Sequence, residues 1–220
     1  MTERIEKTLT FLTECFENGR WFKEHPADKA YRLDHSIRVA NICREIARTE
    51  GMDVEAAVIA GLLHDLAYGM DTPDGYVWSN HGRDGARIAR PFLETLGLDE
   101  KTVNDICYAI AIHVDDKADF EGQRCPFTET VGDADNIDRF DAWRIYESVR
   151  YQAKLEEKTR TEKLDWLGER LAYLAKLSKI EFATPTATAM WQDKVEFQRQ
   201  FFERLKAQME HSILFEEEHL

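Results

Sequence analysis

The stretch Gly61-Leu62-Leu63-His64-Asp65-Leu66-Ala67 places an imidazole and a carboxylate side by side within an apolar run. An ionised aspartate inside such a run costs several kcal/mol unless a cation pairs with it. No lysine or arginine occurs between Gly51 and Arg83, so no local side chain can neutralise Asp65. Adjacent helical residues point about 100° apart, and one cation between these directions is within reach of both side chains. That cation is either a metal ion or an arginine from a distant part of the chain.

Apolar residues recur at spacings of three and four through most of the chain, which is the period of amphipathic helices. Gly51 is placed to end one helix, and Asp53 is placed to cap the next. No segment shows the alternation typical of a strand, so we expect an all-α fold, a compact multi-helix bundle. The expected helices are 3–18, 33–50, 54–67, about 80–96, 100–114, 161–180 and 186–214. Helices also resume near 128 and continue to about 158, and we expect loops at 69–79 and 115–127 and a break near residues 183–185.

The composition is that of a globular protein, with 220 residues, 43% hydrophobic, 32% charged, and a net charge of -13. No apolar run reaches the ~20 residues that span a bilayer, and the N-terminus lacks the apolar core of a secretory signal. We therefore expect a cytoplasmic protein that does not bind membranes. The negative charge disfavours nucleic-acid polymers but not a small phosphorylated molecule, because a bound divalent metal reverses the local sign. The four scattered cysteines form no C-x-x-C pair and are expected to be reduced.

Four histidines stand on apolar helix faces or beside small residues. His35 precedes apolar residues at +4, +7 and +11, while His64 and His113 each follow small or apolar residues at -7, -4 and -3. His81 precedes a glycine at +4 and an isoleucine at +7. A single histidine of this kind is more often a core residue bonded to a backbone carbonyl. Four of them within residues 35–113, joined by interior acids, indicate a metal site.

The second interior acid is Asp135. It stands four residues after Val131 and next to small and apolar neighbours, on the apolar side of its helix. Its carboxylate is therefore a further candidate ligand. The nearby Asp138 could instead pair with Arg139 or Arg144. Imidazole with carboxylate suits Mn, Fe, Co, Ni or Zn, so the spacing does not fix the element.

The order His35, then His64-Asp65, then Asp135 resembles the HD-domain superfamily of metal-dependent phosphohydrolases, over roughly residues 30–145. The local strings agree with the resemblance: Asp34-His35-Ser36-Ile37-Arg38-Val39-Ala40, the stretch around His64-Asp65, and Asp133-Ala134-Asp135-Asn136-Ile137. The resemblance implies one helical domain over residues 1–220, with an HD-like core at about 30–145 and a C-terminal helical extension at about 146–214. It also implies a divalent ion bound by His35, His64, Asp65 and Asp135, with manganese a typical choice.

Some members of the superfamily have two further histidines that carry a second ion, and His81 and His113 occupy such positions. They could equally line the pocket of a single ion, so one or two ions remain open. A metal-bound water held by Asp65 would be the nucleophile. Basic residues at helical spacing from the ligands could bind phosphate, although each could also be only a surface charge; they are Arg38, Lys117, Arg139 and Arg83.

These features predict hydrolysis of a nucleotide or another small phosphoester, as in small stand-alone members of the superfamily. Tyr68, Tyr76 and Trp78 lie in or beside the loop that joins two ligand-bearing segments, where they could stack on a base. Two alternatives remain: a di-iron oxygenase of the same fold, and a non-catalytic ligand-sensing domain. The tryptophan and phenylalanine residues of the last third should pack on the core or on a second subunit, which would make the protein a homodimer.

Overall fold

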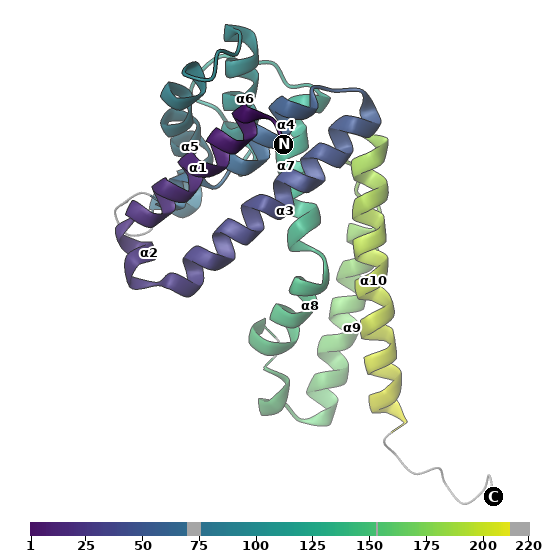
Figure 1. Cartoon of the computed structure of the whole chain (residues 1–220). Coiled ribbons are helices and arrows are strands. Elements are labelled where there is room, and N and C mark those ends of the chain that lie inside the picture. The colour runs from purple at the N-terminus through teal and green to yellow at the C-terminus, as the bar shows by residue number, and fades with distance from the viewer. Residues whose placement is uncertain (70–75, 153, 212–220) are drawn as a thin grey trace, which may run out of the picture. The chain divides into compact units, whose positions relative to one another are not determined.

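The computed structural model describes residues 1–69, 76–152 and 154–211 (Figure 1). Over these ranges the regular elements are all helical and no strand occurs, which confirms the all-α prediction. The chain divides into two compact units. The first comprises Met1–Asp138 and Phe182–Ala187, and the second comprises Arg139–Glu181 and Thr188–Leu220.

The first unit is built on two helix pairs, α3 with α4 and α5 with α6, which make the most extensive contacts between its elements. Helix α4 also packs on α6 and α1, so it lies at the centre of this unit. The elements are α1 (Glu3–Asn18), α2 (Arg20–Glu24), α3 (Pro26–Glu50), α4 (Val54–Leu63), the 3-10 helix η1 (Leu66–Gly69), α5 (Tyr76–Glu94), α6 (Glu100–Ile112) and α7 (Pro126–Arg139).

The turn between α3 and α4 forms as the sequence predicts. Gly51 adopts a left-handed conformation with φ of 71° and donates its backbone N–H to Ala47. Asp53 then caps α4 by accepting the N–H of Ala56 at 3.0 Å. The other end of α4 differs from the prediction of a helix through residue 67. The helix stops at Leu63, and the chain tightens into η1.

Helix α4 is buried from Ala56 to Leu63, and a glycine lets it approach α3 closely. A Cβ atom on Gly61 would lie 2.8 Å from the Cα of Ala40 and 3.0 Å from the Sγ of Cys43. Backbone atoms cannot yield at such distances, so a side chain here would push the two helices apart. The approach of α3 to α4 positions the histidines that these two elements carry.

The second unit contains α8 (Ala142–Glu147), the π-helix η2 (Ser148–Gln152), the 3-10 helix η3 (Leu155–Glu157), α9 (Arg160–Leu177) and most of α10 (Pro185–Glu210). Helices are expected from about 128 to about 158, and the described residues of this range form α7, α8, η2 and η3. Helix α7 ends at Arg139, and Asp141 caps a new helix by accepting the N–H of Ala142 at 2.7 Å. Lys154, with φ of 42°, breaks the segment again before η3. The expected break near residues 183–185 is confirmed, since α9 has ended and α10 begins at Pro185.

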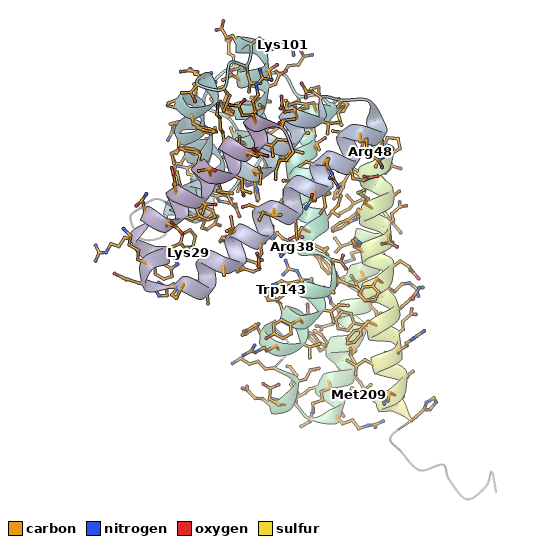
Figure 2. All side chains as sticks on the ribbon, viewed as in Figure 1. Lys29, Arg38, Arg48, Lys101, Trp143 and Met209 are labelled. Atoms are coloured by element: carbon orange, nitrogen blue, oxygen red, sulfur yellow. The ribbon has the colours of Figure 1, made fainter. Side chains whose placement is uncertain are left out.

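The aromatic residues of the last third are only partly buried. Trp191 and Phe202 lie in the interior of the second unit, and Trp191 donates its indole N–H to the carbonyl of Leu177 at 2.8 Å. By contrast, Phe197 and Phe201 are exposed, as is Trp143 at the start of α8 (Figure 2). No helix in the described ranges combines the length and the apolarity that crossing a membrane requires. The acidic tail lies outside the described residues.

The contact between α3 and α4 gives a first prediction. We expect Gly61→Ala to lower the free energy of unfolding by ~1–3 kcal/mol, because the added methyl group overpacks a backbone contact. Gly168→Ala in α9 is the matched control, since a Cβ there meets nothing within 4 Å. It should raise the free energy of unfolding by about 0.5–1 kcal/mol through helix propensity. Denaturant titration of both variants measures the difference. Equal effects would contradict the close approach.

Candidate metal centre

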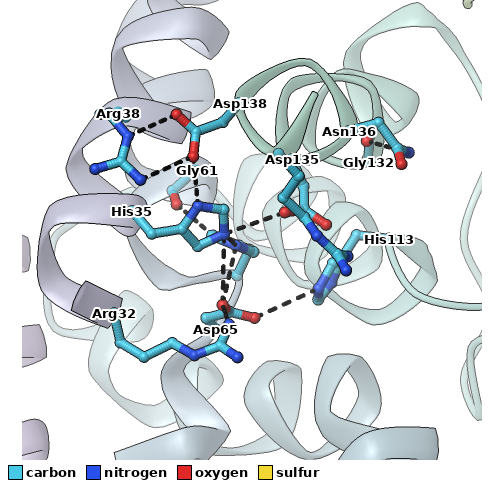
Figure 3. A network of polar contacts seen from close by, with 12 residues as sticks. Arg32, His35, Arg38, Gly61, Asp65, His113, Gly132, Asp135, Asn136 and Asp138 are labelled. Carbon is cyan, nitrogen blue, oxygen red and sulfur yellow. Dashed lines mark hydrogen bonds and ion pairs between the residues drawn. The ribbon is translucent and has the colours of Figure 1, made fainter. Parts of the chain in front are cut away.

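Four side chains from three parts of the first unit converge on one buried point (Figure 3). His35 comes from the middle of α3, His64 and Asp65 directly follow α4, and Asp135 comes from α7. The Nε2 atom of His35 lies 3.3 Å from the Nε2 of His64 and 3.1 Å from Oδ1 of Asp135. Oδ2 of Asp65 lies 3.4 Å from the Nε2 of His64. None of the four residues is more than 8% exposed, so water does not screen their charges.

The hydrogen bonds behind the two rings determine which nitrogen faces the centre. Nδ1 of His64 lies 2.8 Å from the carbonyl oxygen of Gly61, and Nδ1 of His35 lies 2.7 Å from Oδ2 of Asp138. A carbonyl or carboxylate oxygen can only accept, so each Nδ1 carries the hydrogen. In the neutral rings, both Nε2 atoms therefore present lone pairs to each other and to two carboxylates. Such a set of acceptors is stable only around a cation.

The pKa values show how strongly this point attracts positive charge. Burial lowers the pKa of His35, but hydrogen bonds to Asp135 and Asp138 outweigh burial and raise it to about 9. Burial raises the pKa of Asp65 and of Asp135, yet the neighbouring histidines, together with Arg32 at Asp65, hold both well below their usual range. The same carboxylates that stabilise a proton on His35 would therefore stabilise a metal ion at this point. Two imidazole nitrogens and two carboxylates fit a divalent transition metal.

A second group of nitrogens faces the other oxygen of Asp65. Nε2 of His81 lies 3.1 Å from Nε2 of His113 and 3.4 Å from Oδ1 of Asp65. Nε2 of His113 lies 3.8 Å from the same oxygen. Burial, aided by His64, lowers the pKa of His113 to about 4, so this ring is neutral at neutral pH, as a metal ligand must be. Asp65 therefore stands between two groups of histidines, one at each carboxylate oxygen.

Two of these histidines are held in the same way. His64 and His113 each follow the last residue of a helix, α4 and α6 respectively. Each Nδ1 donates to the carbonyl three residues earlier, that of Gly61 or that of Ile110, at 2.8 and 2.7 Å. These carbonyls are helix-terminal groups that need a donor. The same bond that completes the helix end fixes the ring, with Nε2 directed into the site.

The basic residues expected to bind phosphate have other partners. Arg38 makes two bonds with Asp138, of 2.7 and 3.1 Å, rather than facing the centre. Asp138 consequently pairs with His35 and Arg38. Arg139 is the last residue of α7 and belongs to the second unit, where Nε of Arg144 donates to its carbonyl oxygen at 3.2 Å.

The remaining two basic candidates meet the same acid. Arg83 donates to Asp115 at 2.7 Å and to Asn80 at 3.0 Å. The ammonium of Lys117 lies 3.9 Å from Asp115, and its side chain is 75% exposed. The carboxylate of Asp115 thus partly neutralises the positive charge of Arg83 and of Lys117.

Sequence reasoning missed two residues that contact the centre directly. Arg32 donates to Oδ2 of Asp65 at 2.6 Å, and Oδ2 of Asp138 accepts the Nδ1 hydrogen of His35 at 2.7 Å. The prediction that Asp65 has no local partner was correct, and a distant arginine is the partner that the structure supplies. Both residues lie one helical turn from a candidate ligand, Arg32 before His35 and Asp138 after Asp135. That spacing is the signal from which they could have been found.

The aromatic residues of the loop after η1 can be placed only in part. The ring of Tyr68 lies 4.9 Å from the ring of His81, so Tyr68 borders the second group of histidines. The side chains of Tyr76 and Trp78 lie outside the described residues. Stacking on a base by these three residues remains a prediction.

Comparison with known proteins identifies a family and a shared fold. The model of the HD domain family matches residues 32–143, more than half of the chain. A predicted HD superfamily hydrolase from an uncultured Thermotogales bacterium superimposes with a TM-score of 0.62 at 24% identity, covering 92% of this chain and 91% of that one. This likeness shows a shared fold.

Curated relatives are similar to part of this chain. Ribonuclease Y of Lawsonia intracellularis is 36% identical over 85 residues, which are 39% of this chain and 14% of that protein. Ribonuclease Y of Mycoplasma mycoides is 44% identical over 62 residues, 28% of this chain and again 14% of that protein. The chain thus spans about one seventh of the length of these relatives. With the family model matched across the buried histidines and aspartates, the chain belongs to the HD domain family.

Proposed function

We propose that this chain is a metal-dependent phosphohydrolase that acts on a nucleotide or another small phosphoester. The observation that carries the proposal is the convergence of two imidazole lone pairs and two carboxylates at one buried point. Membership of the HD domain family supports it. In this proposal His35, His64, Asp65 and Asp135 hold a divalent transition metal, such as manganese.

The chemistry needs little beyond this donor set. A divalent ion lowers the pKa of a bound water and polarises a phosphoryl oxygen. In the hydrolysis, the oxygen of water forms a bond to phosphorus, the ester P–O bond breaks, and the leaving oxygen gains a proton. Asp65 is placed to orient the attacking water, because its two oxygens face the two groups of histidines. Asp138 keeps the hydrogen of His35 on Nδ1, which leaves Nε2 available as a ligand.

Charge and burial favour a small substrate over a polymer. The net charge of -13 repels a long polyanion, whereas a divalent ion attracts a single phosphate group locally. The ribonuclease Y relatives are named for action on RNA, but the similarity covers about one seventh of their length. A similarity over so small a part of those proteins does not support RNA as the substrate of this chain.

The group around His35 and His64 is the stronger candidate for the first ion. The hydrogens of His35 and His64 are both engaged on Nδ1, so in the neutral rings neither Nε2 can donate to the other. We therefore assign the first ion to this group. Metal stoichiometry decides whether a second ion binds at His81 and His113, whose Nε2 atoms lie 3.1 Å apart.

The first test removes ligands. We expect His64→Ala and Asp65→Ala to lose bound manganese and phosphatase activity. Loss of a residue that only hydrogen-bonds to a ligand lowers metal affinity or activity by ~10–100-fold, and loss of a ligand itself should lower them by more. Asp105→Ala on α6 is the control, because this aspartate pairs with the exposed Lys101. Metal content is measured by elemental analysis, and activity by screening manganese-loaded protein against nucleotides and sugar phosphates. Wild-type metal occupancy in Asp65→Ala would contradict the assignment.

The same experiment separates the alternatives. Iron-loaded protein that consumes oxygen and cleaves no phosphoester would identify an oxygenase. Metal that raises the melting temperature without any cleavage would identify a ligand-sensing domain. Cleavage that depends on added metal and is lost in both ligand variants supports the phosphohydrolase.

The second test counts ions. If two ions bind, His113→Ala should lower the stoichiometry from two ions to one, while His35→Ala should remove the ion that the first group holds. Elemental analysis after exhaustive dialysis measures both, with circular dichroism to verify the fold. An unchanged metal content in His113→Ala would show that His113 only lines the pocket of a single ion.

A further inference from the structure

Two arginines flank His35 on the same helix, one turn to each side, and they have different partners. Arg38 and Asp138 lie on one side of the His35 ring, and Arg32 and Asp65 lie on the other (Figure 3). Arg38 is bound through two of its nitrogens to Asp138. Asp138 in turn receives the hydrogen of His35 at 2.7 Å. The role of Arg38 is therefore to hold the carboxylate that orients His35.

Arg32 is bound through one nitrogen. Its Nη1 donates to Oδ2 of Asp65 at 2.6 Å, and within the described part of the chain no acceptor is bonded to its Nε or Nη2. A guanidinium has five N–H donors in a fixed plane, so most of its capacity is unused. Its side chain is 20% exposed, against 3% for that of Asp65. Unused donors thus lie at the edge of a buried centre, where an entering ligand can meet them.

Two contacts fix the guanidinium in this place. The Arg32 carbon Cζ lies 3.8 Å from the centre of the Tyr68 ring, a cation–π contact that uses none of the N–H groups. The bond to Asp65 fixes the orientation of the plane. The same Oδ2 atom lies 3.4 Å from Nε2 of His64 and 3.6 Å from Nε2 of His35. Arg32 is therefore separated from the candidate metal centre by a single shared oxygen atom.

We propose that Arg32 is the anion-binding residue of this site, donating from Nε and Nη2 to a phosphoryl oxygen while Nη1 remains on Asp65. The inference rests on the proposed function and specifies how the phosphate group is recognised. The formal charges of Arg32, Asp65 and Asp135 sum to one negative charge, and a divalent cation reverses that sign. A metal-loaded centre therefore attracts an anion, and Arg32 supplies directional donors for it.

The test compares three arginines on α3 in the full-length, manganese-loaded protein. We expect Arg32→Gln to keep its metal, to raise the dissociation constant of inorganic phosphate by about 10–100-fold, as loss of a charge-assisted bond does, and to raise KM more than it lowers kcat. Arg32→Lys keeps the charge but not the planar donors, so it should restore part of both effects. Isothermal titration calorimetry gives the phosphate affinity, and elemental analysis gives the metal content.

The two other arginines serve as matched comparisons. Arg38→Gln should weaken metal binding, because Asp138 loses its partner, without changing phosphate affinity per metal-loaded site. Arg48→Gln should change nothing, since Arg48 is 69% exposed and pairs only with Glu45 among the described residues.

Three results would overturn the role of Arg32. The first is an unchanged phosphate affinity and KM in metal-loaded Arg32→Gln, which would mean that Arg32 only neutralises Asp65. The second is a loss of metal in Arg32→Gln whose reloading fully restores phosphate binding. The third is a wild-type protein that binds metal but not phosphate. If wild-type protein binds phosphate yet cleaves no phosphoester, the proposed function fails while the phosphate titrations still test Arg32. If Arg32→Gln does not fold, Arg32→Lys tests the planar donors alone, and an unchanged phosphate affinity and KM in metal-loaded Arg32→Lys would then overturn the role.

Discussion

The burial of one carboxylate is the constraint on which the rest of the first unit depends. Asp65 follows a helix whose side chains are almost all buried, and an uncompensated charge there costs several kcal/mol. The chain meets this cost with one arginine and with a set of histidines at each carboxylate oxygen. The close approach of α3 and α4 at Gly61 brings His35 and His64 together. The packing of α4 therefore also determines where the charged groups lie.

The histidines His35 and His64 are also held from behind, and this support determines which of their nitrogens face the candidate centre. The carbonyl of Gly61 and the carboxylate of Asp138 fix the hydrogens of His64 and His35 on Nδ1. Arg38 fixes Asp138 in turn. Without these partners the rings could rotate or exchange their hydrogens, and the lone pairs would not converge. Outer hydrogen bonds of this kind orient metal ligands and raise their basicity.

Helix phase was sufficient to predict which histidines and aspartates face inward, because spacing within one helix determines its faces. Partners from other helices could not be predicted in the same way. Arg32 and Asp65 are 33 residues apart, and His35 and Asp138 are 103 apart. Local patterns predicted helices between about 128 and 158 but not the boundary between them, which lies where Asp141 caps α8.

The two arginines beside His35 show why the family alone does not define the substrate. Both are basic, both lie one turn from a candidate ligand, and from the sequence they are equivalent candidates for binding phosphate. Their partners distinguish them. The buried carboxylate of Asp138 accepts two hydrogen bonds from Arg38. Arg32 donates one hydrogen bond to Oδ2 of Asp65, an oxygen that also faces the histidines, and among the described residues its other N–H groups remain available. Candidate metal ligands can thus be predicted from an HD pattern, whereas a candidate phosphate-binding arginine is distinguished by the N–H donors that its own partners leave unused. In this chain that distinction assigns recognition to Arg32.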